Sequence, residues 1–267
     1  MGKVISILNH KGGVGKTATA VNLGAALKLL CGYRVLFVDM DGQANLTDSL
    51  GLSQSQELET LQHVGYKRNI NDAINDAIKG KYELPIYENM QGLEIAPSCL
   101  DLSAVEMTLI GEPGRETFLK KLLEPVRDTY DFILVDCPPS LSLLTLNAMT
   151  ASDSLIIPVQ SEYLAIRGMT KLTSVIKSVK ERLNGDLEIE GVLITQYDSR
   201  KNLSKSIAEL VNEMFAGKVF KTYIRENVTI AEATSVGCDV ISHSPTSAGA
   251  KDYTALCEEF LSNNAMD

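Results

Sequence analysis

Short, continuously apolar runs alternate with longer stretches of helical periodicity along this chain. Six such runs are predicted to form strands, and they are apolar at nearly every position, as is typical of strands covered on both faces. They span residues 4–9, 35–39, 93–96, 132–136, 154–159 and 191–195. Because strands and helices alternate over the whole length, we expect an α/β fold with a doubly wound, mostly parallel sheet and helices on both faces.

The clearest helical pattern lies between residues 166 and 183. Apolar residues recur there at steps of three and four, and the basic residues fall mostly off the resulting stripe. The stripe consists of Ile166, Met169, Leu172, Val175, Ile176, Val179 and Leu183. Another helix is predicted to begin near Lys16. Residues 53–92 are polar and the least regular part, and we expect a helix plus surface loop there.

The composition is that of a folded domain. The chain has 267 residues, of which 45% are hydrophobic and 22% charged, which is enough for one sizeable core and predicts a single domain over residues 1–267. No apolar run approaches the roughly 20 residues that span a bilayer. The short apolar stretch at the start is followed at once by Lys11 and Gly12, which indicates a buried strand and not a signal peptide. We therefore expect a cytoplasmic protein, with no room before the first strand for an N-terminal DNA-reading domain.

The five cysteines point to no metal or iron–sulfur site. They stand at positions 31, 99, 137, 238 and 257, and no two have the spacing of a CxxC pair or a metal knuckle. We expect reduced and mostly buried thiols.

Charge is segregated along the sequence. The net charge of −9 argues against a protein that coats DNA with its whole surface. Residues 167–182 and 199–225 are nevertheless each rich in Lys and Arg, with few acidic residues between them. A local basic face is therefore compatible with the acidic total.

The sharpest chemical signal is the run Lys11-Gly12-Gly13-Val14-Gly15-Lys16-Thr17, between the first strand and a helix. Glycines allow a backbone to wrap a polyphosphate with its N–H groups, and the helix N-terminus adds partial positive charge. Lys16 is expected to reach the β- and γ-phosphates of ATP, and Thr17 to place its hydroxyl on Mg²⁺. His10 stands where the general pattern has its first glycine, and Lys11 is an additional lysine. The alternative is a glycine-rich turn without a ligand.

Aspartates follow two of the predicted strands. Asp39 and Asp41 end one strand region and Asp136 ends another. Ligands of parallel sheets bind beyond the carboxyl ends of the strands, so these carboxylates should converge on the glycine loop. Asp136 fits a Walker B residue that holds Mg²⁺, and Asp41 could orient the attacking water. The alternative is that a strand-end aspartate merely caps the next helix, and for Asp39 the two interpretations are equally favoured.

The chain resembles the ParA/Soj family of deviant-Walker DNA-partition ATPases. The blocks that carry the resemblance are NHKGGVGKTATAVNLGAAL, VLFVDMDGQANLT, YDFILVDCPPSLSLLTLNAM, IIPVQSEYLAIRGM and GVLITQYDSRKNLSKSI, between residue 4 and about residue 207. A weaker match, VFKTYIRENVTIAEATSVGCDVI, continues to residue 241. The resemblance therefore covers nearly the whole chain.

The resemblance implies a cycle of ATP-driven dimerisation. Two subunits would close face to face around the nucleotides, with Lys11 reaching the partner's phosphates and Gly12 at the seam. Asp41 would activate water and Asp136 would be the Walker B residue. The nucleotide contacts implied are Lys11, Gly12, Gly13, Val14, Gly15, Lys16, Thr17 and Ala18. The dimer would bind DNA without sequence preference at the nucleoid, and a ParB-like partner would stimulate hydrolysis; plasmid, chromosome and mobile-element cargo all stay open.

Three departures from the family pattern bear on this cycle. Ala18 replaces a threonine, which removes a hydroxyl contact worth about 1 kcal/mol. Gly42 replaces a proline, which predicts a more flexible segment without nucleotide. Glu226 and Thr229 replace two arginines, one of which belongs to the family's DNA-binding patch.

The predicted DNA contacts are Arg200, Lys201, Lys205 and Arg225. They would neutralise phosphates, so binding would be salt-sensitive and blind to sequence. The alternative is a solvated helix face. By family analogy, adenine contacts are expected from the loops around residues 195–198 and 224–228.

Three other functions known for this fold would each need a further feature. A MinD-like positioning ATPase would need a basic amphipathic C-terminal helix, whereas residues 257–267 are acidic and short, so we expect no membrane binding. An electron-transfer ATPase like the nitrogenase iron protein would need paired cysteines. A metabolic ligase or kinase on the same fold would need a substrate pocket.

Overall fold

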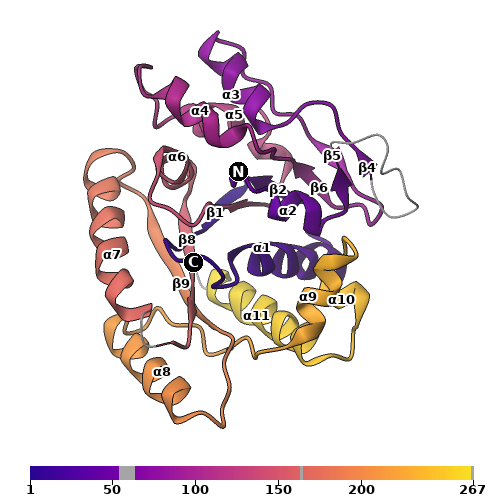
Figure 1. The fold of residues 1–267 in the computed structure, drawn as a ribbon, viewed down its shortest axis with the longest axis vertical. Helices are drawn as coiled ribbons and strands as arrows, with labels where there is room; N and C mark the ends of the chain where they lie inside the picture. Colours follow the sequence, from indigo (N-terminus) through magenta and orange to yellow (C-terminus); the bar gives the residue numbers. More distant parts are fainter. Residues whose placement is uncertain (54–63, 163–164, 266–267) are drawn as a thin grey trace.

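A seven-stranded sheet forms the centre of the computed structural model, which describes residues 1–53, 64–162 and 165–265 (Figure 1). The strand order is β5-β6-β2-β7-β1-β8-β9, and every neighbouring pair is parallel except β5 and β6. The bounds are β1 Lys3–Ile7, β2 Val35–Asp39, β5 Tyr87–Glu88, β6 Glu94–Ala96, β7 Phe132–Asp136, β8 Ser154–Gln160 and β9 Glu188–Thr195. All six predicted strands are confirmed, with shifts of up to three residues at their ends.

Helices cover both faces of the sheet, as predicted (Figure 1). One face carries α1 (Lys16–Ala25), its π-helical continuation η1 (Ala26–Leu30), α2 (Asn45–Ser49), α9 (Val228–Ser235), α10 (Val240–His243) and α11 (Ala248–Asn264). The other carries α3 (Ile70–Ile78), α4 (Leu102–Leu109), α5 (Phe118–Leu123), α6 (Leu143–Ala151), α7 (Ala165–Arg182) and α8 (Asn202–Met214). A 3₁₀ turn, η3 (Arg127–Thr129), precedes β7. Among the helices described, none combines the length and apolarity that crossing a bilayer requires.

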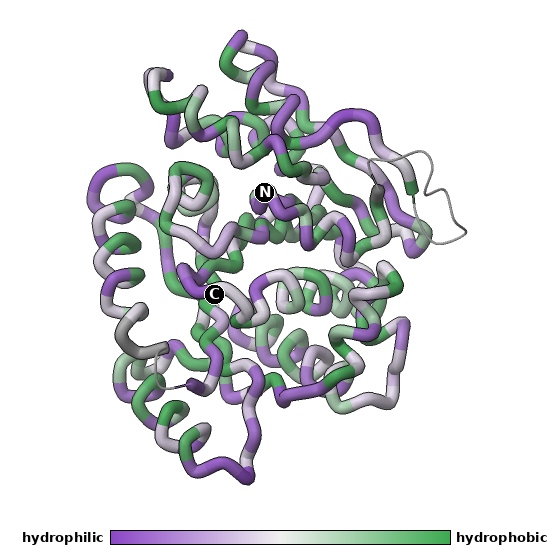
Figure 2. The backbone as a smooth tube through the Cα atoms, viewed as in Figure 1, coloured by the Kyte–Doolittle hydropathy of each residue, from purple (hydrophilic) through white to green (hydrophobic). Residues whose placement is uncertain are grey.

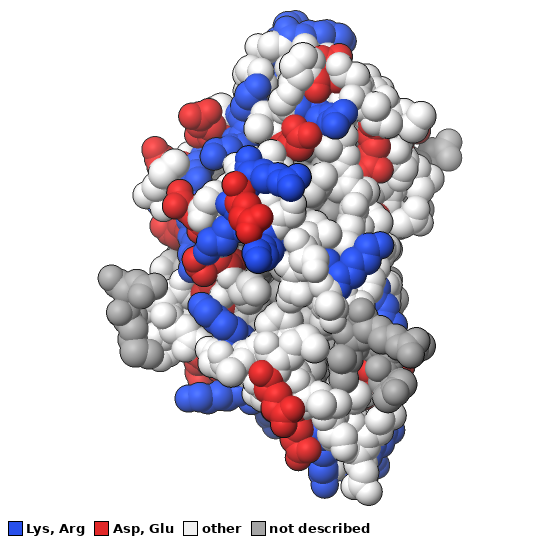
Figure 3. All heavy atoms as spheres, turned by 90° about the vertical axis from the view of Figure 1, so that its left-hand side faces the viewer, with Lys and Arg blue, Asp and Glu red and all other residues white. Residues whose placement is uncertain are grey.

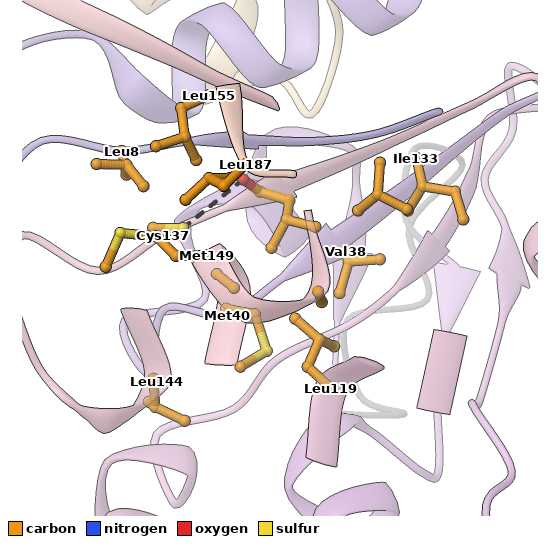
Figure 4. Close-up of a cluster of buried hydrophobic side chains, with 14 of the residues drawn as sticks. Leu8, Val38, Met40, Leu119, Ile133, Cys137, Leu144, Met149, Leu155 and Leu187 are labelled. Carbon is orange, nitrogen blue, oxygen red and sulfur yellow. Dashed lines mark hydrogen bonds between the residues drawn. The ribbon is translucent and has the colours of Figure 1, made fainter. Parts of the chain in front are cut away.

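The side chains of each central strand point alternately into two hydrophobic clusters, one on each face of the sheet. Ile133 and Val135 of β7 point into the cluster beneath α3–α8, while Phe132 and Leu134 point into the cluster beneath α1 and α11. Figure 4 shows the first cluster, in which Met149 of α6 lies among side chains from several strands. Two-sided burial explains why these strands read as continuously apolar in the sequence, and the tube in Figure 2 shows the same apolar centre.

The irregular stretch 53–92 contains the predicted helix. Asn69 caps α3 by accepting from the N–H groups of Asn71 and Asp72, and the Asp72 carboxylate accepts from the Asn69 N–H in return. The two-residue strands β3 (Leu52–Ser53), β4 (Val64–Gly65) and β5 were not predicted, because two residues cannot show a period; β3 pairs with β4. Residues 54–63 lie outside the described part.

The predicted stripe of α7 faces the sheet. Met169, Leu172, Ile176 and Val179 are buried, whereas Leu183 lies just beyond the helix and is 40% exposed. The side chain of Ile166 is outside the described part of the structure.

Parallel pairing brings the ends of three strands together. β7 lies between β1 and β2, and in the register Ile7 and Asp39 are both opposite Asp136. The segments that follow β1, β2 and β7 therefore leave the sheet side by side, and this edge holds the candidate site.

Candidate nucleotide-binding site

The loop between β1 and α1 has the backbone shape of a phosphate-binding loop. Gly13 and Gly15 adopt φ angles of 74° and 86°, a left-handed region that residues with a Cβ rarely enter. Gly15 caps α1, and its carbonyl accepts from both the N–H (2.9 Å) and the hydroxyl (2.7 Å) of Thr19. The backbone N–H groups of residues 12–15 donate a hydrogen bond to no acceptor among the described residues. The loop thus offers a row of donors next to a helix N-terminus, which suits an anion.

Two residues at the end of β9 hold this loop in place. The Thr195 hydroxyl donates to the Val14 carbonyl (2.8 Å), and the Gln196 side-chain amide donates to the Gly13 carbonyl (2.7 Å). Because C=O and N–H point in opposite directions across a peptide plane, fixing these carbonyls also orients the N–H groups that follow them. The sequence predicted adenine contacts here; the structure adds a loop-positioning role that no sequence pattern indicated.

A cavity of about 770 Å³ opens over the loop, a size suited to a nucleotide. Its walls include residues 224–228 and one side of α9, next to the loop. The predicted residues that line it are Gly12, Gly13, Gly15, Lys16, Thr17, Ala18 and Asp41. Val14 is buried beneath the loop instead, so it can contribute only backbone atoms.

The two predicted metal ligands, Thr17 and Asp136, lie in direct contact. The Thr17 hydroxyl donates to Asp136 Oδ2 over 2.6 Å. Asp136 is fully buried, and its Oδ1 has no hydrogen-bond partner among the described residues. A buried carboxylate oxygen without a partner is costly, and a carboxylate beside a hydroxyl is a donor set that Mg²⁺ accepts. The residues present therefore fit the ion.

Burial favours the neutral forms of two ionisable groups at the site, Asp136 and Lys16. It raises the pKa of Asp136 well above the ordinary value, and the neighbouring Asp39 raises it further. Burial likewise lowers the pKa of Lys16, whose ammonium donates to the Lys11 carbonyl over 3.2 Å, against the opposing pull of Asp136. A polyanion and a divalent cation would each relieve one of these costs.

Asp39 and Asp41 make different contacts. The carboxylate of Asp39 accepts from the N–H of Asp41 (3.1 Å) and from the N–H (2.9 Å) and hydroxyl (2.7 Å) of Thr47. Burial raises the pKa of Asp39 to about 7. Its bonds shape the β2–α2 loop, so the structural interpretation of Asp39 is the one that the contacts support. Asp41 is only 7% exposed but lines the cavity, and its Oδ1 accepts from the Gln43 N–H (3.0 Å).

Gly42, which replaces a family proline, lies against the start of α4. A Cβ at this position would come within 2.2 Å of the Ser103 hydroxyl oxygen. The glycine therefore permits a close approach of α4 to the β2–α2 loop. The greater flexibility predicted for this segment stays a prediction.

Lys11 points away from the cavity of its own chain. Its ammonium pairs with Glu162, just after β8, over 2.7 Å, and donates to Gln160, the last residue of β8, over 3.2 Å. The side chain is 30% exposed, so it is accessible to a second molecule.

The imidazole of His10 packs against α7, in a space that a glycine at position 10 would leave empty. A Cβ added to Gly168 would come within 1.9 Å of the imidazole, so the two residues fit only as a pair. Burial lowers the pKa of His10, and the nearby Lys171 lowers it further. The departure from the usual loop pattern at position 10 thus has a packing reason.

The predicted DNA contacts share one neighbourhood, but acidic groups balance most of them. A β-bridge between Tyr197 and Arg225 sets the segment that leads from β9 to α8 beside the segment between α8 and α9. Four pairings involve these cations: Arg200 with Asp198 (2.9 Å), Lys201 with Asp198 (3.8 Å), Lys201 with Glu226 (3.2 Å), and Arg225 with Asp252 (2.6 Å). Lys205 is exposed on α8. Figure 3, which views the side carrying α7 and α8, shows blue and red residues interspersed and no uniform basic field.

A glycine loop between the first strand and a helix, with a lysine, a threonine and a strand-end aspartate around it, defines a P-loop nucleotide hydrolase. Comparison with known proteins agrees. A family model described as an AAA domain matches residues 2–189. The chain is 44% identical over 264 residues to the sporulation initiation inhibitor protein Soj of Bacillus subtilis, which covers 98% of this chain and 100% of that protein. It is 40% identical over 266 residues to the chromosome-partitioning ATPase Soj of Treponema pallidum, covering 100% of both.

Solved structures share the fold. Cobyrinic acid a,c-diamide synthase from Mycobacterium smegmatis, with bound ADP and magnesium, superposes with a TM-score of 0.82 at 31% identity, over 99% of this chain and 96% of that one. The chain therefore belongs to the Soj/ParA family of AAA-domain partitioning ATPases, and it is a P-loop ATPase. The resemblance predicted from the sequence is confirmed, and the prediction of ATP and Mg²⁺ as cofactors is confirmed at the level of the family.

Proposed function

We propose that this chain is a DNA-partitioning ATPase that works as one domain in the cytoplasm. Its ATP-bound form closes into a sandwich dimer that binds the DNA of the nucleoid without sequence preference. A ParB-like partner stimulates hydrolysis and so releases the DNA. The observation that carries the proposal is the position of Lys11, which stands at the loop but outside the cavity, paired with Glu162.

In this proposal each loop residue has a defined task. Residues 12–15 donate backbone N–H groups to the phosphates, and Lys16 neutralises the β- and γ-phosphates from the start of α1. Thr17 and Asp136 hold Mg²⁺, which when bound neutralises charge on the phosphate oxygens. Asp41 lies at the cavity wall, where its carboxylate can orient a water molecule.

Dimerisation then requires an exchange of partners at Lys11. In the single chain its ammonium is balanced by Glu162. A phosphate of the second subunit's nucleotide carries more negative charge than a carboxylate, so it can displace Glu162 at a close-packed seam. Without ATP no such competitor exists, which makes the association dependent on nucleotide.

The proposed test is light scattering coupled to size exclusion, with ATP, ADP or no nucleotide. Wild type is expected to dimerise only with ATP. Lys11→Ala should stay monomeric while it still binds ATP, whereas Glu162→Gln should dimerise at lower protein concentration because Lys11 is released. Lys79→Ala, an exposed lysine of α3's C-terminus, is the matched control. A Lys11→Ala variant that dimerises like wild type would refute the proposed contact.

DNA binding in the proposal rests on Arg200, Lys201 and Lys205, with Arg225 as a weaker contributor. Arg225 is committed to Asp252 through three short contacts and lines the nucleotide cavity. Arg200 has 88% of its side chain exposed, more than Lys201 with 59% or Arg225 with 52%. Since Asp198 and Glu226 balance part of this charge, we expect DNA binding to be weak in a monomer and to gain from the two copies of a dimer.

The alternative of a MinD-like ATPase on a membrane finds less support. The C-terminal helix α11 uses its apolar side chains inside the protein, where Tyr253, Leu256 and Phe260 are buried. Co-sedimentation with anionic vesicles in the presence of ATP tests this alternative. A ligase-like activity is tested by turnover, which should rise with DNA and a partner protein and not with a small carboxylate acceptor.

A further inference from the structure

Two cysteines that are far apart in the sequence face each other on the surface opposite the glycine loop. Cys31 follows η1 and Cys257 lies in α11, and their sulfur atoms are 4.0 Å apart. Both are free thiols; Cys31 is exposed and Cys257 is buried. The sequence spacing of 226 residues hides this pair, which exists only because α1 and η1 pack against α11.

We propose that Cys31 and Cys257 form a reversible intramolecular dithiol–disulfide site that takes a small-molecule disulfide as its oxidant. A bond between the two sulfurs needs a movement of about 2 Å from their present separation. Cys31 is placed to supply it, because it ends a helix and is followed by Gly32, whose φ of 77° makes a sharp turn. Cys257 is held in the middle of a long helix.

The two thiols have different access, which sets the order of events. Cys31 is exposed and can meet an oxidant from solvent. Burial, together with the neighbouring Cys31, raises the pKa of Cys257 to about 12. Cys257 therefore stays protonated and shielded at first, and Cys31 is the thiol that reacts first.

The reaction balances as two thiol–disulfide exchanges. The Cys31 thiolate attacks one sulfur of the small disulfide, forming a mixed disulfide and releasing one small thiolate. Cys257 then gives up its proton, attacks the sulfur of Cys31 and releases the second small thiolate. The two protein thiols are oxidised to one disulfide, and the small disulfide is reduced to two thiols.

The site is connected to the nucleotide cavity through two helices. α1 begins at Lys16 of the glycine loop and continues through η1 to Cys31. α11 carries Asp252, which holds Arg225, and Tyr253, which lines the cavity. A bond between Cys31 and Cys257 would therefore fasten the far end of the phosphate-binding helix to the helix behind the cavity.

The test treats the full chain with oxidised glutathione and then blocks remaining thiols. The intact mass of wild type, taken before the thiols are blocked, should fall by two hydrogen atoms, and the blocked protein should yield a peptide that links Cys31 to Cys257. Dithiothreitol should reverse both changes. Its melting temperature should rise by about 5–10 °C, since a cross-link that closes so long a loop restricts the unfolded chain. Cys238→Ser, which leaves the pair intact, should behave like wild type.

Cys31→Ser changes only an exposed position and should remain folded, but it should form no cross-link and show no rise in melting temperature. Cys257→Ala should stop at a stable glutathione adduct on Cys31. The proposal is overturned if wild type itself stops at that adduct, if the cross-link joins two chains, or if Cys31 and Cys257 stay reduced. None of these readouts involves ATP or DNA, so they are independent of the proposed function.

Discussion

At the scale of single residues, burial and the neighbouring Asp39 both oppose the charged form of Asp136. One of its oxygens accepts from Thr17, and the other is buried without a partner in the described structure. A cation bound at the free oxygen would stabilise the anionic carboxylate beyond what Thr17 and Lys16 provide. The residue is built for binding and not for the stability of the empty protein.

This cost predicts a pH dependence that the variant Asp136→Asn should remove. The pKa of this carboxyl is about 4 in the unfolded chain and higher in the folded protein. As the pH rises from the unfolded pKa to the folded pKa, the group therefore lowers the free energy of unfolding more and more. Without nucleotide, Asp136→Asn should melt about 4 °C above wild type at pH 8, and the difference should shrink toward pH 5. Differential scanning fluorimetry in EDTA measures this.

The exposed Asp186 supplies the control, since Asp186→Asn should melt like wild type throughout. Magnesium with ATP should stabilise wild type and not Asp136→Asn. Identical melting curves for wild type and Asp136→Asn at every pH would show that the carboxyl carries no such cost.

Two variants of Asp41 distinguish its role in ATP hydrolysis from its role in shaping the β2–α2 loop. Asp41→Asn keeps an oxygen that can accept from the Gln43 N–H but loses the base, and Asp41→Ala loses both. Both should hydrolyse ATP about 100-fold more slowly while they still bind it, and both should accumulate as ATP-bound dimers. Phosphate release and light scattering give the two readouts. Near-normal hydrolysis by Asp41→Asn would assign water orientation to another group.

At the scale of elements, the end of β9 holds the glycine loop. The Thr195 hydroxyl is buried and bonded to the Val14 carbonyl, a contact between segments 181 residues apart. Such a contact has no signature in sequence, because nothing in either segment specifies the other. The glycines of the loop were predictable for the opposite reason, since a left-handed backbone requires them locally.

Thr195→Val should loosen the glycine loop while the side chain at position 195 keeps nearly the same volume. The variant loses the donor to Val14, which should cost about 1 kcal/mol of stability and weaken ATP binding several-fold. Thr195→Ser keeps the hydroxyl and should bind ATP nearly as wild type does. Titration with a fluorescent ATP analogue compares the three proteins, and equal affinity for Val and Ser variants would contradict the positioning role.

At the scale of the whole molecule, charge decides how the protein meets DNA. Basic residues concentrated in two sequence segments suggested a basic face, yet in the fold acidic partners approach from other segments, such as Glu226 and Asp252. The net positive charge of these two sequence segments therefore overestimates the positive potential at the surface of the fold. The exposed Arg200 remains the residue on which a phosphate contact is best tested.

Arg200→Glu should lower the affinity of the ATP-bound protein for duplex DNA about 10-fold at low salt, uniformly across sequences. The slope of log affinity against log salt should also become shallower by about two to four units for a dimer that loses contacts at both copies. Fluorescence anisotropy with duplexes of different sequence measures both. Lys79→Glu, on the α3 side of the molecule, is the control and should leave DNA binding unchanged.

Six of the strands, the doubly wound class, the glycine loop and the family could be predicted from the sequence, because periodicity, glycine requirements and motif spacing are local properties of the chain. Which distant groups meet became visible in the fold alone: Thr195 with the glycine loop, Glu162 with Lys11, acidic residues with the predicted DNA cations, and Cys31 with Cys257. The physical reason is that these contacts depend on which strands pair and which helices share a face, and no short stretch of sequence contains that information.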